Sequence, residues 1–248
     1  DALIKFSQEI EADLIATGHY AQIKKIEGEF ILSKGIDASK DQSYMLWDID
    51  KKQLSKTLFP IGGMTKQEVR EYAIKHDLET ANRAESQDLC FVLGDDYSQF
   101  LYEIDPDKMA NISDGPIVDE ENNKVGMHKG FTSYTVGQRK GLGLSFPEPR
   151  YVKKINPINN TIVVSKKDAL YSNRCTAHSI NLLKDDVAFP ANIMAQIRYN
   201  SKPSLAKIEI NADDEINIEF ENPQLAITPG QSIVFYEDNT LIGGAIIK

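Results

Sequence analysis

The order of apolar and polar positions predicts helices and strands in turn over the first hundred residues. Residues 3–13 are helix-forming and run into residues 14–17, an apolar stretch of the length of a short buried strand. Residues 20–33 alternate about Glu27 and Gly28, as the two strands of a β-hairpin do. This part of the chain therefore predicts an α/β arrangement.

A second set of signals marks helix starts in the same region. Thr65 and Glu68 have the spacing of a capping box, in which each side chain accepts a hydrogen bond from a free amide at the helix start. That helix is expected to end near His76. Further predicted elements are a helix over 43–49, a strand over 89–93 and a helix over 97–104.

From residue 112 onward, short β-rich runs are separated by Gly, Pro, Asn and Asp, which indicates two small all-β units. The predicted strands are 115–119, 151–155, 161–165, 192–198, 206–210, 216–220, 232–236 and 240–247. The predicted fold class is α/β followed by all-β. The predicted domains are residues 1–104, 105–175 and 176–248, with the second boundary near Cys175.

Composition narrows the class of protein. The 248 residues are 41% hydrophobic and 26% charged, as in folded soluble proteins, and no run approaches the roughly 18 apolar residues of a membrane helix. Two cysteines are too few for a disulfide framework, which fits a reducing, cytoplasmic setting. The chain begins at Asp1, so a fragment of a longer protein is expected.

The net charge of −9 argues against a simple nucleic-acid-binding protein, but the charge is unevenly distributed. Between residues 124 and 154 the basic side chains face a single acidic residue, Glu148. They are Lys124, Lys129, Arg139, Lys140, Arg150, Lys153 and Lys154. This middle segment predicts a contact with a polyanion.

Two cysteines are candidates for chemistry. Cys90 follows the polar run 85–88 and lies in an apolar strand, so it is either a thiolate nucleophile or sulfur carrier or, as isolated cysteines more often are, a packing residue. Cys175 has less to recommend it and is expected to be structural.

Other polar sites are weaker signals. The segments 126–130 and 135–143 combine glycines with basic residues, which suits phosphate contact, yet no P-loop or GxGxxG pattern is present. Lys40, Asp41 and Gln42 follow a polar loop that is either a base-contacting or a solvated segment. His19 follows a strand end, and the four histidines lack ligand spacing, so no metal is expected.

In combination these segments are more specific than any of them alone. The chain resembles the tRNA-specific 2-thiouridylases, which replace an oxygen of the wobble uridine with sulfur, and the resemblance covers essentially all 248 residues. It is carried by 16–20 (Ala-Thr-Gly-His-Tyr), 40–46 (Lys-Asp-Gln-Ser-Tyr-Met-Leu), 59–63, 85–91 (Glu-Ser-Gln-Asp-Leu-Cys-Phe), 115–118, 128–130, 134–143, 197–199 and 228–231.

The resemblance implies the end of an adenine-nucleotide α-hydrolase-like α/β domain, a β-rich tRNA-binding domain and a C-terminal β-barrel. It also implies that ATP, with Mg²⁺, adenylates the uridine carbonyl oxygen. A cysteine persulfide, loaded by a sulfur-donor protein, then delivers sulfur, and a second cysteine helps to release it. Cys90 matches the persulfide-bearing cysteine and Gly18 a nucleotide-contacting glycine. The positions that match tRNA contacts are His19, Lys40, Asp41, Gln42, Arg198, Tyr199 and Gln231.

One departure from the family pattern concerns the chemistry. The Ser-Gly-Gly-x-Asp-Ser pyrophosphate loop and the first catalytic cysteine of the family are not found in the 248 residues, and Cys175 is too far along the chain to replace that cysteine. A disulfide at Cys90 would need such a partner. We therefore expect these residues alone neither to adenylate nor to thiolate tRNA.

Three other hypotheses remain open at this point. The chain is a tRNA-docking module without chemistry, a sulfur carrier that uses Cys90, or a structural β-barrel protein without an RNA partner. The docking module predicts salt-sensitive tRNA affinity, and the sulfur carrier predicts fast alkylation of Cys90. The structural protein predicts no tRNA affinity at any salt concentration.

Overall fold

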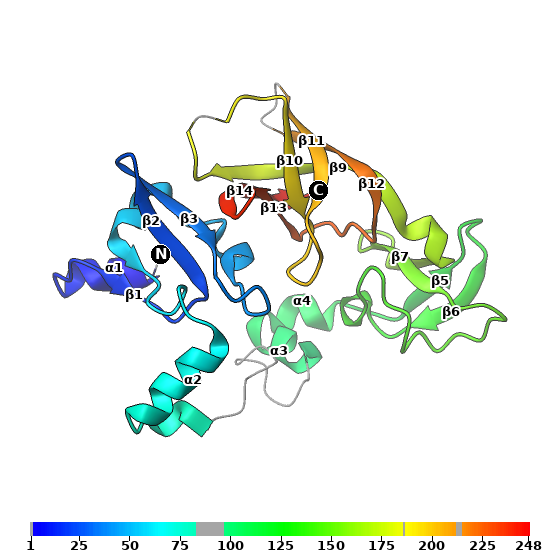
Figure 1. Ribbon diagram of the computed structural model, residues 1–248. Coiled ribbons are helices and arrows are strands. Elements are labelled where there is room, and N and C mark those ends of the chain that lie inside the picture. Colours follow the sequence, from blue (N-terminus) through cyan, green and yellow to red (C-terminus); the bar gives the residue numbers. More distant parts are fainter. Residues whose placement is uncertain (1, 83–96, 186, 212–214) are drawn as a thin grey trace. The chain divides into compact units, whose positions relative to one another are not determined.

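The structure is a computed structural model that describes residues 2–82, 97–185, 187–211 and 215–248. The chain divides into two compact units (Figure 1). The first, here called the barrel unit, comprises Asp1–Arg83, Asn173–Asn222 and Pro229–Lys248. The second, the central unit, comprises Ala84–Ser172 and Pro223–Thr228. The predicted three-domain division stays a prediction.

Six strands close into a barrel, because β14 pairs with both β9 and β13 and completes the ring β13-β10-β11-β12-β9-β14 (Figure 1). Their bounds are β9 Tyr171–Leu182, β10 Ala191–Gln196, β11 Ser204–Ile210, β12 Ile216–Leu225, β13 Ser232–Glu237 and β14 Thr240–Ile247. The predicted C-terminal β-barrel is confirmed. A closed ring leaves no unpaired sheet edge along these strands.

Alternation explains why these strands form. Along β12, buried Ile216, Ile218 and Phe220 alternate with exposed residues, and β11 follows the same period of two. The pattern missed β9, whose sequence is mostly polar and whose first four residues are exposed. The pairing of β9 with β12 and β14, rather than its own hydrophobicity, therefore specifies this strand.

The N-terminal residues of the barrel unit contain the predicted strand and hairpin. β1 (Ile15–Ala16) pairs in parallel with β4 (Thr57–Leu58). β2 (Ala21–Ile26) and β3 (Glu29–Lys34) form the hairpin, with positive φ at Glu27 and Gly28 in the two-residue turn. Ser33 of β3 pairs with Thr240 of β14, so the hairpin continues the sheet of the barrel.

The helices of this region are shorter than the sequence predicts. α1 covers Ala2–Glu9 instead of 3–13, and Glu11 has a left-handed φ of 55° that no helix accommodates. The helix predicted over 43–49 is the single 3₁₀ turn η1 (Ser43–Leu46). The remaining helices here are η2 (Lys51–Lys56), α2 (Lys66–Lys75) and η3 (Glu79–Asn82). The capping box of Thr65 and Glu68 is confirmed, as is the end of α2 at His76.

Side chains from η1 and the segment that follows it anchor the N-terminal residues to the barrel. The Tyr44 hydroxyl donates to the Ser232 carbonyl (2.8 Å) and the Trp47 indole N–H to the Ser232 hydroxyl (2.9 Å). Asn181 of β9 donates to the Trp47 carbonyl (2.7 Å). Because these bonds fix η1 side chains to the barrel, tertiary contacts rather than helix propensity determine the local backbone.

The central unit holds a four-stranded sheet in the order β6-β5-β8-β7 and several short helices. The predicted 97–104 helix is confirmed as α3, and the 156–160 turn joins β7 to β8. β6 was missed because the glycines and basic residues of 126–130 indicated a loop. The bounds are α3 Tyr97–Ile104, α4 Pro106–Ala110, β5 Gly115–Val118, β6 Lys124–His128, η5 Phe131–Ser133, β7 Tyr151–Asn156, β8 Thr161–Ser165 and η6 Lys167–Leu170.

Two kinds of feature are absent from the part of the chain that the structure describes. None of its helices is long and apolar enough to cross a membrane. Within the same residues, no group of three or more His, Cys, Asp or Glu side chains is arranged to hold a metal ion.

Candidate functional site

A groove of about 750 Å³ lies in the barrel unit where residues from the N-terminal hairpin and loop meet the loop between β10 and β11. The residues that line it include Asp41 from the 35–42 loop and Tyr199 from the barrel, both predicted to contact tRNA. Two parts of the sequence more than 150 residues apart are thus brought to one surface. We call this site the hairpin groove.

Asp41 holds its loop in place. Its Oδ1 accepts hydrogen bonds from the backbone amides of Gly35 (2.9 Å) and Ser43 (3.2 Å), and its Oδ2 accepts one from the Ser43 hydroxyl (2.8 Å). The Ser43 hydroxyl in turn lies 3.1 Å from the hydroxyl of Tyr236, a buried residue of β13. The carboxylate is therefore committed to bonds within the protein.

Gln42 connects the same loop to the segment that holds Gly18 and His19. Its side-chain Oε1 accepts a hydrogen bond from the backbone amide of Tyr20 (3.0 Å), and its backbone amide donates one to the Tyr20 carbonyl (2.9 Å). Lys40 lies one residue before Asp41, and its amide donates to the Asp37 carbonyl (3.0 Å). Four of the predicted positions therefore lie on two segments that are hydrogen-bonded to each other: 18 and 19 on one, 41 and 42 on the other.

His19 is half-buried and lies edge-on to the ring of Phe59, with the two centroids 5.6 Å apart. Its Nδ1 is 2.8 Å from the Thr17 hydroxyl. Burial lowers the pKa of His19 below its usual value, so the ring is neutral at pH 7. A neutral imidazole suits a hydrogen bond to a base better than an ionic contact with phosphate.

Tyr199 is the exposed aromatic residue of the groove, with 41% of its surface accessible. Its ring packs edge-on against Tyr44, with centroids 6.1 Å apart. The Gln196 amide group donates to the carbonyls of Arg198 (2.9 Å) and Tyr199 (2.8 Å), which fixes the backbone that carries both side chains. Burial, then the charge of Asp41, raises the pKa of Tyr199, so its hydroxyl stays protonated.

Gln231 does not line the hairpin groove. It is exposed and precedes Ser232, whose carbonyl and hydroxyl accept the bonds from Tyr44 and Trp47. Gln231 is therefore connected to the groove only indirectly: its neighbour Ser232 is bonded to Tyr44, which packs against Tyr199.

The two cysteines differ in what can be said of them. Cys90, the predicted persulfide carrier, lies outside the described residues. Cys175 lies on β9, and burial raises the pKa of its thiol to about 12, so it is a neutral thiol at pH 7. That environment is the one expected for a structural cysteine.

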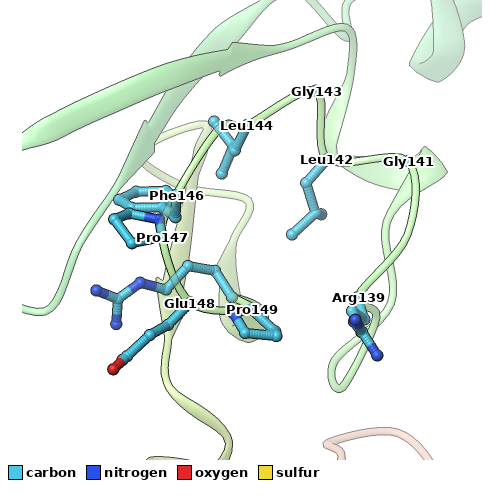
Figure 2. A pocket seen from close by; sticks show the side chains of 10 residues that line it. Arg139, Gly141, Leu142, Gly143, Leu144, Phe146, Pro147, Glu148 and Pro149 are labelled. Carbon is cyan, nitrogen blue, oxygen red and sulfur yellow. The ribbon is translucent and has the colours of Figure 1, made fainter.

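A second pocket, of about 360 Å³, is lined by residues within 139–150 of the basic segment, among them Arg139 and Arg150. Figure 2 shows Arg139 across this pocket from Phe146 and Pro147. The Arg150 guanidinium carbon lies 4.9 Å from the centroid of the Phe146 ring. Lys153 is paired with Glu120 (2.6 Å), whereas Lys124, Lys129, Arg139 and Lys140 are exposed.

Three lysines of the hairpin groove were missed at the sequence level: Lys24 on β2, Lys34 at the end of β3 and Lys202 beside Tyr199. Lysines on a hairpin and in a loop are ordinary surface residues, so no sequence signal separates them from others. Only the folding of the hairpin onto the barrel sheet brings them together.

Models of three protein families match the chain in sequence order. They are described as a tRNA methyl transferase HUP domain over residues 1–94, a tRNA methyl transferase PRC-barrel domain over residues 100–166 and an aminomethyltransferase β-barrel domain over residues 172–247. The third match coincides with the closed barrel strands.

Curated relatives match along the whole chain. The tRNA-specific 2-thiouridylase MnmA of Halothermothrix orenii is 42% identical over 249 aligned residues, which span 100% of this chain and 69% of that protein. The MnmA proteins of Clostridioides difficile and Clostridium kluyveri are 41% and 40% identical, again over 100% of this chain and 69% of their own lengths.

Proposed function

Because the chain belongs to the tRNA-specific 2-thiouridylase family, we propose that its hairpin groove and the adjoining loop bind tRNA for 2-thiolation of the wobble uridine. One observation carries this proposal. The groove combines Asp41 and Tyr199, which come from separate tRNA-contact motifs of the resemblance, and the loop of Asp41 is bonded through Gln42 to the segment of His19.

The chemistry of the side chains suggests a division of roles. Lys40 and Arg198 carry positive charge next to the groove residues and suit phosphate oxygens. Tyr199 offers an exposed ring on which a base can stack, and neutral His19 offers a hydrogen bond to an unpaired base. Asp41 acts by holding the loop, while Gln42 and Gln231 are neutral hydrogen-bonding side chains.

For the complete reaction we propose three successive steps. The uridine carbonyl oxygen attacks the α-phosphate of ATP and releases pyrophosphate. The terminal sulfur of a persulfide on Cys90, loaded by a sulfur-donor protein, attacks the activated carbon and displaces AMP. A second thiol then attacks Cys90, which breaks the sulfur–sulfur bond, leaves the transferred sulfur on the base and forms a disulfide. The buried thiol of Cys175 is poorly suited to be that second group.

The residues present supply only a small part of an ATP site. At Gly18 a side chain would meet only Ile61, at 3.9 Å, so the backbone there is open to a ligand. A loop for the phosphates is not among the motifs of the 248 residues, so we assign them no phosphate chemistry and no Mg²⁺ ligand.

The tRNA-binding proposal is tested by replacing Tyr199 with alanine and measuring affinity for a tRNA with a wobble uridine. A stacked base contributes about 1–3 kcal/mol, so we expect a loss of roughly 5- to 150-fold in affinity. Tyr171→Ala is the matched control, because Tyr171 is 44% exposed and lies outside the groove residues. Equal affinities of the two variants would contradict the proposal.

A separate measurement addresses catalysis by these 248 residues alone. Incubated with tRNA, ATP, Mg²⁺ and a persulfide donor, they are expected to form no 2-thiouridine, because the pyrophosphate loop and the family's first catalytic cysteine are not found among them. Mass spectrometry of the digested nucleosides provides the readout. Detection of 2-thiouridine above the level of a Cys90→Ser control would refute this part of the proposal.

A further inference from the structure

We propose that Lys24, Lys34 and Lys202 form a phosphate-binding wall of the hairpin groove that holds the sugar–phosphate backbone of the bound RNA beside Tyr199. The inference rests on the proposed tRNA-binding function and assigns it residues that belong to none of the motifs that carry the family resemblance. It names the part of the RNA that each side of the groove contacts.

The wall is built from two elements. In the β2–β3 register Lys24 lies two residues from Gln22, which pairs with Ser33, so Lys24, Gln22 and Ser33 share one face of the hairpin. All three line the groove. The second element is the β10–β11 loop, which is distant from the hairpin in sequence. It carries Lys202, three residues after Tyr199.

The charge of this wall is available to a ligand. Among the residues that the structure describes, no acidic side chain forms an ion pair with Lys24 or Lys202, and both lysines are exposed. Of the described residues that line the groove, only Asp41 is acidic, and its oxygens already accept bonds from Gly35 and Ser43. In a chain with a net charge of −9 this is a local concentration of positive charge.

Lys34 contacts a buried aromatic residue of the core that the N-terminal hairpin forms with the barrel strands. Its ammonium nitrogen lies 4.2 Å from the centroid of the Tyr236 ring, a cation–π contact. The hydroxyl of Tyr236 lies 3.1 Å from that of Ser43, which donates to Asp41. Asp41 is therefore a positioning residue that, through Ser43 and Tyr236, holds the ring under Lys34.

The combination of lysines with an exposed aromatic ring favours RNA over other anions. Ammonium groups contact phosphates without regard to base, and a ring beside them accepts a stacked base. A groove that bound a small anion would need no exposed aromatic platform. An acidic protein surface is the competing partner, and the experiment below separates the two.

The test compares neighbouring lysines on opposite faces of β2. Lys24→Gln and Lys202→Gln are each expected to lower tRNA affinity roughly three- to tenfold and to reduce the slope of log affinity against log salt by about 0.7–1. Lys25→Gln is the matched control. Lys25 follows Lys24 directly, is also exposed, lies 5.5 Å from the Phe30 ring and does not line the groove.

The outcomes are distinct. Unchanged unfolding temperatures with a selective loss in the Lys24 and Lys202 variants would support the wall. If the wild-type chain binds tRNA and all three variants match it in affinity and salt slope, the wall is refuted while the tRNA-binding proposal stands, and an acidic protein face becomes the better partner. If the wild-type chain itself fails to bind tRNA at low salt, both proposals fall.

Discussion

At the scale of single residues, Trp47 shows how closely the N-terminal segment fits the barrel. A side chain at Gly244 of β14 would meet atoms of the Trp47 ring at 2.7–2.8 Å, closer than real contacts allow. The ring is 7% exposed and its N–H is bonded to Ser232, so it has little freedom to move. The barrel therefore accepts this tryptophan only because residue 244 is glycine.

We expect Gly244→Ala to destabilise the protein by about 1–3 kcal/mol, because the added methyl group overpacks the contact and displaces the indole from Ser232. Urea unfolding followed by tryptophan fluorescence measures both effects. Gly63→Ala is the control, since a side chain there would have nothing within 4 Å. Equal urea midpoints of unfolding for the two variants would show that the space between residue 244 and the Trp47 ring can accept a methyl group, which would contradict this prediction.

His19 gives a prediction about pH. Burial lowers the pKa of folded His19 below the value of 6.5 that it has when unfolded, so the unfolded chain binds more protons just below that pH. The free energy of unfolding should therefore rise with pH up to about 6.5, and its His19 contribution should be lost as pH falls. His19→Gln should flatten the pH dependence of the free energy of unfolding below about pH 6.5, as measured by urea unfolding at a series of pH values.

At the scale of elements, α2 depends on the contacts at its N-terminal end. None of its residues is buried. Its first turn is held by the Thr65 and Glu68 capping box, with the Thr65 amide 2.7 Å from the Glu68 carboxylate, and by Asp37, whose carboxylate accepts a hydrogen bond from the Lys66 amide (2.9 Å). The pKa of Glu68 is lowered by the backbone bond with Thr65 and then by the side-chain bond. These bonds therefore favour the ionised carboxylate.

Removal of this cap should unfold the helix start locally rather than the whole protein. We expect Thr65→Ala to cost about 1 kcal/mol and to speed amide exchange in the first turn of α2 roughly fivefold, with the barrel strands unchanged. Thr65→Ser keeps the hydroxyl and should restore wild-type exchange. Faster exchange throughout the barrel would contradict a purely local role.

Element by element, the sequence predicted those structures whose signal is local. The hairpin at 20–33, the capping box and the alternating strands β11 and β12 have their own periodicity or turn residues, and all were found. β9 is polar and forms because β12 and β14 pair with it, and β6 was missed because the glycines and basic residues of 126–130 indicated a loop. Periodicity carries no information about pairing between distant strands.

The same distinction applies to the site. Asp41, Tyr199 and the loop of Gln42 were identified by motif resemblance, and their meeting at one groove follows from the hairpin joining the barrel sheet. Lys24, Lys34 and Lys202 belong to none of these motifs. The sequence could not indicate that Asp41 serves as a support, because its bonds depend on Ser43 and the buried Tyr236.

At the scale of the whole molecule, an acidic chain is proposed to bind an acidic polymer. The net charge of the chain and the proposed binding of RNA are compatible only if binding depends on local positive charge. In the barrel unit this charge is supplied by Lys24, Lys34, Lys40, Arg198 and Lys202. The overall charge repels RNA, so the attraction must act at short range. Screening by salt should then weaken binding steeply.

The affinity of the 248-residue chain for a tRNA with a wobble uridine, measured by fluorescence anisotropy from 50 to 200 mM salt, tests the central claim most directly. With about five phosphate contacts to single-stranded or loop RNA, affinity should fall by roughly one hundred-fold over that range. Absence of binding at 50 mM, or an affinity that does not change with salt, would contradict the account.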